Sequence, residues 1–184
     1  MAAMGPRTGM CCSKRNGGVT KVTLLFHRCE LLNDLKQYAF VEGDVMKVQE
    51  EHERHQTMDI VEDGNVERVT RVLNIAWARS VEALYPYCKE PAEGLDVLDN
   101  MFESPQDYVI DLRLPEGVAA SSVVLAKELI HEYMVCTAMA EWMSITNVDA
   151  EGRWRQKAET AIEGFRSALN NRRRPLRRKQ HPFG

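Results

Sequence analysis

The stretch YMVCTAMAEWMSITNVDAEGRWRQKAETAIEGFRSAL, residues 133–169, contains the two strongest helical patterns of the chain. Its first part, Tyr133–Ile145, is apolar on almost every side, which is typical of a central helix or of a subunit interface. Its second part repeats apolar residues at helical spacing, in the order Trp154, Ala158, Ala161, Ile162, Phe165, Ala168 and Leu169. The polar residues Thr146, Asn147 and Asp149 separate the two parts. Two helices joined by so short a turn predict an antiparallel helical hairpin.

Further helices are predicted on the N-terminal side of this hairpin. Ser121 or Ser122 can cap the helix that runs to about Ile145. Apolar periodicity predicts one helix over Glu30–Val41 and a longer one that follows Asn65 and ends near Tyr85. The intervening residues 45–57 are polar enough to be a solvated helix or a mobile connection.

Two short segments alternate apolar and polar residues with the period of a β-strand. The first is Val19–Phe26 and the second, clearer one is Asp107–Leu114, which Pro115 and Gly117 end. Two strands are not stable alone, so we expect them to pair and to pack on helices. The predicted fold class is mainly α, a helical bundle with a minor two-stranded β element. Residues 19–171 form the bundle domain, and residues 1–18 are predicted to be a disordered extension.

Charge is strongly segregated along the chain. Residues 172–184 carry six cations and no acid: Arg172, Arg173, Arg174, Arg177, Arg178 and Lys179. Residues 22–171 carry 14 basic and 27 acidic side chains. We interpret residues 172–184 as an extended basic tail. It suits phosphate binding, docking into an acidic groove, a localisation signal or simple solubility, but it lacks the interleaved aromatics that stack on bases.

Catalytic and metal-binding patterns are not evident. Glu128 and His131 have the spacing of a di-iron motif, but the chain has no second such pair, so a surface pair is expected. His52 and His55 lie in a charged run that predicts a solvated helix face. The sequence contains no phosphate-binding glycine loop and no nucleophile elbow. We therefore expect a non-enzymatic protein without metal or cofactor, with its cysteines reduced and no membrane span.

Several stretches resemble a family of phage and prophage proteins from Bacteroides-type hosts. They are ELLNDLKQYAFVEGDVM (30–46), DGNVERVTRVL (63–73), LYPYCK (84–89), LIHEYMVCTAMAEWMSITN (129–147) and the ending His181-Pro182-Phe183. Such proteins are mostly uncharacterised structural components of the head and tail-joining region. Their architecture is similar to the head-to-tail connectors, or adaptors, of long-tailed phages. In these connectors a small helical bundle forms a twelve-fold ring under the portal and an extended terminal segment docks onto it.

The resemblance implies a structural virion protein, assembled in the host bacterial cytoplasm, that forms a homo-oligomeric ring between the portal and tail proteins. The basic tail is then the segment that contacts the portal or the DNA backbone. The apolar helix predicts the subunit interface, at Tyr133, Met134, Met139, Trp142 and Met143. Two alternatives remain open: a tail-completion or tail-terminator protein, and a small nonspecific nucleic-acid-binding protein that uses the basic tail.

Overall fold

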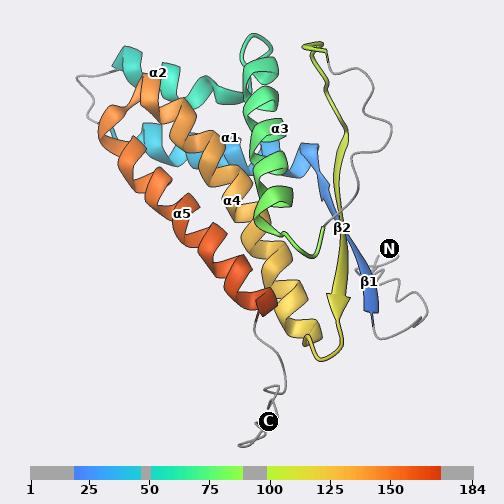
Figure 1. The fold of residues 1–184 in the computed structure, drawn as a ribbon. Coiled ribbons are helices and arrows are strands. Elements are labelled where there is room, and N and C mark those ends of the chain that lie inside the picture. The colour runs from blue at the N-terminus through green and yellow to red at the C-terminus, as the bar shows by residue number, and fades with distance from the viewer. Residues whose placement is uncertain (1–18, 47–50, 89–98, 171–184) are drawn as a thin grey trace, which may run out of the picture.

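The computed structural model describes residues 19–46, 51–88 and 99–170 (Figure 1). The elements follow in the order β1 (Val19–His27), α1 (Arg28–Val45), α2 (Glu51–Met58), the 3-10 helix η2 (Asp59–Val61), α3 (Val66–Ala83), β2 (Asp107–Pro115), α4 (Ala120–Thr146) and α5 (Val148–Asn170). The predicted mainly α class with a minor two-stranded β element is confirmed. The predicted N-terminal extension and basic tail lie outside the described residues.

The α4–α5 hairpin forms the centre of the fold, and its two helices lie side by side in Figure 1. Only Asn147 separates the helices, so the connection is shorter than the sequence predicted. One linking residue suffices because Asn147 also caps the next helix: its Oδ1 accepts a hydrogen bond of 3.3 Å from the backbone N–H of Ala150 at the start of α5. The N-terminal cap of α4 differs from the prediction. Ala119 occupies the cap position without a side-chain bond, and Ser121 and Ser122 lie inside the helix.

The two strands pair with each other, as predicted. They are antiparallel, with a register that runs from Val19 opposite Pro115 to His27 opposite Asp107. Alternate side chains form the buried face: Leu24, Phe26, Tyr108, Ile110, Leu112 and Leu114. This period-two burial is the direct consequence of the alternating sequence.

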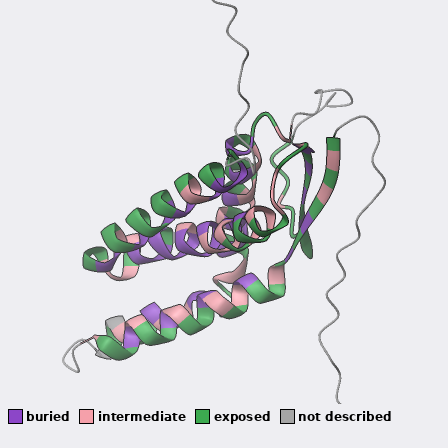
Figure 2. Ribbon diagram, turned by 90° about the horizontal axis from the view of Figure 1, so that it is seen from below, coloured by how far each residue is buried: buried purple, intermediate pink, exposed green. Residues whose placement is uncertain are grey.

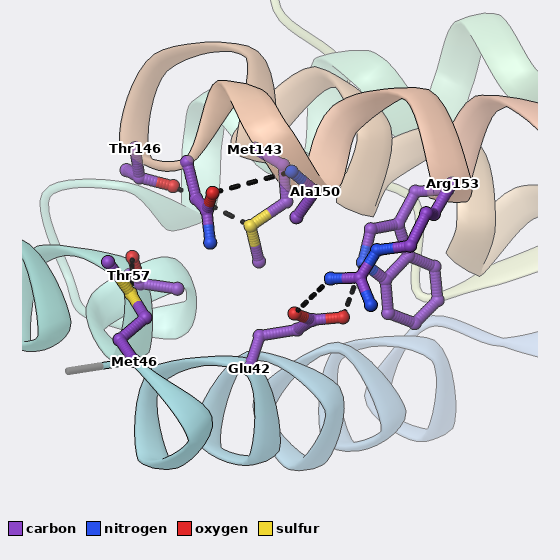
Figure 3. A network of polar contacts seen from close by, with 9 residues as sticks. Glu42, Met46, Thr57, Met143, Thr146, Ala150 and Arg153 are labelled. Atoms are coloured by element: carbon purple, nitrogen blue, oxygen red, sulfur yellow. Dashed lines mark hydrogen bonds and ion pairs between the residues drawn. The ribbon is translucent and has the colours of Figure 1, made fainter.

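A polar network ties α1 to the α4–α5 hairpin (Figure 3). The Glu42 carboxylate, on α1, accepts a 3.0 Å hydrogen bond from the Trp154 indole N–H and a 3.1 Å hydrogen bond from Arg153, both on α5. Nearby, the indole N–H of Trp142 on α4 donates to the Thr57 carbonyl oxygen at the end of α2, at 3.0 Å. Both α1 and α2 are thus joined to the hairpin by specific hydrogen bonds.

None of the helices in the described part of the chain is long and apolar enough to cross a membrane.

Candidate functional site

The five side chains predicted at a subunit interface lie in the core of the single chain. Their exposed fractions are 6 % for Tyr133, 0 % for Met134, 0 % for Met139, 8 % for Trp142 and 0 % for Met143. Buried residues, purple in Figure 2, line the sides on which the helices face one another. A side chain that is already covered within one chain has almost no surface to offer a second copy. The structure thus corrects this prediction and favours the other interpretation of the apolar pattern, a central helix.

The neighbours of α4 explain why it is apolar all round. It contacts α1 and α2 on one side and α3 and α5 on others. The edge of the Tyr133 ring packs against Phe165 of α5, with 6.1 Å between the ring centroids. The sequence periodicity indicates how many sides of a helix are apolar. It does not indicate whether those sides are covered by the same chain or by a second copy.

The end of α5, which precedes the basic tail in the sequence, has specific contacts. The last residue of α5, Asn170, has its Oδ1 2.9 Å from the Tyr87 hydroxyl, which also lies 3.4 Å from the Leu169 carbonyl oxygen. One turn earlier, the Arg166 side chain donates to the Ala83 carbonyl oxygen at the end of α3, at 3.3 Å. The six predicted tail cations follow directly but lie outside the described residues. The end of α5 is therefore held against the end of α3 and the turn that follows it.

An open cavity of about 1110 Å³ lies where α5 ends. Arg79 and Arg166 line it together with Tyr85, whose side chain is 63 % exposed. A second cavity, of about 260 Å³, continues between α3 and α5 over the surface of α4, with Arg79 common to both and Arg155 added. We call these two cavities the α3–α5 groove.

The groove combines arginines with acidic side chains. Glu82, Glu141 and Glu159 lie along it, and Arg155 forms an ion pair with Glu151 in the preceding turn of α5. At the end nearest Asn170, Arg79 and Arg166 line the same cavity as Glu82, so cations outnumber acids there. An arginine pair at a concave surface is well suited to carboxylate or phosphate groups of a partner, because guanidinium groups bind both in a bidentate manner. Arg79 and Arg166 are far apart in the sequence, and no local pattern indicates that they meet.

The other polar candidates have structural partners. His131 Nε2 lies 2.8 Å from the Asp34 carboxylate of α1, so this histidine joins two helices, whereas Glu128 contacts Lys127 at 2.9 Å. His52 is exposed and contacts Gln56, in agreement with a solvated helix face. In the described ranges, no three His, Cys, Asp or Glu side chains gather as a metal site would require.

Three titratable groups of the described residues have raised pKa values: the partly buried Tyr38, and Tyr108 and Cys136 in the core. Burial, reinforced by the neighbouring Glu132 carboxylate, raises the pKa of the Cys136 thiol to about 12. Burial likewise raises the pKa of Tyr108 to about 12, and its hydroxyl donates to Asn74 at 2.7 Å. Both groups therefore stay protonated near neutral pH. A protonated, fully buried thiol is a poor nucleophile, so Cys136 acts as a packing residue.

No family model, no curated protein and no solved structure matches the chain.

Proposed function

We propose that this protein is a structural component of a tailed phage virion, a head-to-tail adaptor that forms a ring between the portal and the tail. The observation that supports it best is the run of six cations in residues 172–184, which follows an acidic body in the sequence. The last described residue before it, Asn170, lines the α3–α5 groove together with Arg79 and Arg166. A tail of this composition has little to bury on its own chain and is suited to an acidic partner surface. The resemblance to phage connector-type proteins supplies the identity of that partner, the portal.

The acidic body has a role in the same proposal. With 27 acidic and 14 basic side chains in residues 22–171, a ring of these bodies has a negative potential. A negative channel wall repels the DNA duplex and prevents it from sticking during passage. Docking is thus assigned to the basic tail, and the bundle acts as a non-adhesive spacer.

The proposed role is non-enzymatic. The histidines described above have structural partners or face solvent, and the two largest pKa displacements belong to the buried residues Tyr108 and Cys136. The ring contacts must involve exposed surface, because the core of α4 is occupied within one chain.

The test is co-assembly with the cognate portal protein, followed by size exclusion with light scattering at moderate salt. The full chain is expected to elute with the portal as an oligomer. A variant in which all six tail cations are replaced by glutamine is expected to lose the portal, whereas six glutamines at exposed cations of the body serve as a matched control and should leave binding intact. A chain that stays strictly monomeric and ignores the portal refutes the proposal.

The two alternatives make different predictions in the same assay. A tail-completion or terminator protein binds the tail tube protein in place of the portal. A nonspecific nucleic-acid-binding protein is favoured by one observation: the six cations of residues 172–184 follow an α5 helix whose end lines a cavity with Arg79 and Arg166. It predicts a gel shift whose affinity falls steeply with salt, with a logarithmic slope of about 0.9 for each phosphate contacted. Deleting residues 172–184 should then abolish the shift.

A further inference from the structure

The two edges of the β-sheet differ in how they are covered. On the outer edge of β2, the Trp77 indole N–H donates to the Val109 carbonyl oxygen at 3.1 Å, and the Arg113 N–H donates to the Tyr87 carbonyl oxygen at 2.9 Å. Odd-numbered residues of β2 therefore direct their backbone groups away from β1. In Figure 2, β2 lies between α3 and β1, which leaves β1 at the margin of the molecule.

The register shows which backbone groups of β1 point outward. Lys21 is opposite Arg113 and Leu25 is opposite Val109, so the odd-numbered residues of β1 also direct their N–H and C=O groups away from the partner strand. Among the described residues, no backbone or side-chain group hydrogen-bonds this outer edge of β1. A nine-residue strand with an open edge is a template for another strand.

A groove runs beside β1, between this strand and the first half of α4; it is lined mainly by apolar residues near the start of β1 and mainly by charged or titratable residues near its end. A cavity of about 190 Å³ borders Thr20–Val22 and includes Val124, and one of about 560 Å³ borders Leu25–His27 and includes Leu125. Val124 is 51 % exposed and Leu125 52 % exposed. On the outer face of the sheet, Leu25 is exposed to 43 %. Apolar side chains therefore flank the open edge on both faces of the sheet.

The charge at the edge is polarised along the strand. Two cations, Lys21 and Arg113, are directly opposite each other near the start of β1, an arrangement that is unfavourable within one sheet. The other end has an excess of acid. Asp107 lies 2.6 Å from His27, and four carboxylates line the groove with one lysine, Lys127, which pairs with Glu128: Glu30, Asp34, Glu128 and Glu132. If a second strand also has a basic start and an acidic end, antiparallel pairing places its basic start against this acidic end.

We propose that β1 pairs with β1 of a second copy of this chain, antiparallel and with Thr23 on the two-fold axis. The result is a continuous four-stranded sheet, with Lys21 of each copy opposite Leu25 of the other. The charge polarity described above becomes complementary, and the same patch serves both copies, as a two-fold interface requires. Pairing of this kind supplies the backbone partners that the outer edge of β1 lacks in the described part of the chain. The contact goes beyond the proposed function, because it is a property of the free chain and needs neither portal nor tail.

The first test removes the outward N–H at the centre of the edge. Sedimentation of the full chain is expected to show a concentration-dependent dimer of twice 21.0 kDa. Thr23→Pro should be monomeric over the same concentrations, since its N–H faces the second copy, and proline is tolerated on an edge strand where the N–H faces outward. Thr23→Ala is the matched control, because both variants lose the 2.6 Å hydrogen bond from the Thr23 hydroxyl to Asp111 but only alanine keeps the N–H. The alanine variant should still form dimers.

A second pair of variants keeps the test valid if proline prevents folding. Leu125→Glu places a charge at the groove and should give a monomer, whereas Ile145→Glu changes a similarly exposed residue (55 %) at the far end of α4 and should leave the dimer intact. Backbone amides of Lys21 and Leu25 should exchange with deuterium more slowly as the protein concentration rises.

Several results would overturn the pairing: a Thr23→Pro or Leu125→Glu variant that still forms dimers, a wild-type chain that is monomeric, or a dimer lost on deletion of residues 172–184. The last result would identify the basic tail as the occupant of the edge. Failure here is distinguishable from failure of the proposed function. A monomer that binds the portal refutes only the strand pairing, whereas a dimer that ignores the portal refutes only the adaptor role.

Discussion

Replacing Met139 by alanine tests whether the apolar half of α4 is the core of one chain or a contact between chains. Met139 is fully buried, and the substitution removes its Cγ, Sδ and Cε atoms. Loss of three methylene-sized groups, with the cavity that remains, gives a destabilisation of about 3 kcal/mol. In a chain of this size, that loss lowers the melting temperature by roughly 6–12 °C.

The assay is urea unfolding at several protein concentrations, followed by circular dichroism. Because Met139 is covered by its own chain, the difference between alanine variant and wild type should be the same at every concentration. Met139→Leu nearly conserves the volume and should cost less than about 1.5 kcal/mol, which makes it the control. An alanine variant with unchanged unfolding free energy and a lower oligomeric mass would show that the Met139 side chain lies between copies and not in the core of one chain.

Three further substitutions probe other contacts of the fold. Gly43→Ala puts a Cβ 2.7 Å from Met58 Cγ, so urea unfolding should show a net loss of up to about 2 kcal/mol; a gain of helical stability would contradict this close approach. Cys136 ionises near its ordinary pKa in the unfolded chain, but its pKa in the fold is about 12. Between these two pKa values its contribution to stability falls as the pH rises, by about 1.4 kcal/mol per pH unit. Cys136→Ala should therefore flatten the alkaline limb of stability against pH, and an equally steep limb would exclude this cause. Trp154→Phe removes the 3.0 Å hydrogen bond to Glu42 and should cost about 1–3 kcal/mol; additive losses in a double-mutant cycle with Glu42→Ala would show that the bond contributes nothing.

The secondary structure was predictable because it depends on local periodicity. Alternation in residues 107–114 defined β2 to within one residue, and the apolar spacing from Trp154 to Leu169 defined most of α5. Helix starts were less predictable. Ser121 is a good cap in isolation, but α4 begins at Ala120, so the start of this helix did not follow side-chain capping preference.

The candidate sites were only partly predictable. The cations of residues 172–184 are evident in the sequence because composition alone reveals them. The shared position of Arg79 and Arg166 is not, because these residues line one cavity only once the ends of α3 and α5 have packed together. The groove beside β1 has the same origin, since its walls come from two segments about a hundred residues apart.

The sequence by itself determined which residues form helices and strands, that the two strands pair on an apolar face, and that charge separates into an acidic body and a basic end. Local pattern suffices for these properties because helix and strand periods are fixed by backbone geometry. Only the tertiary structure decided that α4 is covered by its own chain and that, among the described residues, the outer edge of β1 and not that of β2 has no hydrogen-bond partners. The physical reason is that the sequence specifies an apolar side chain or a backbone N–H but not the group that will cover it. That partner is defined only when distant segments pack together.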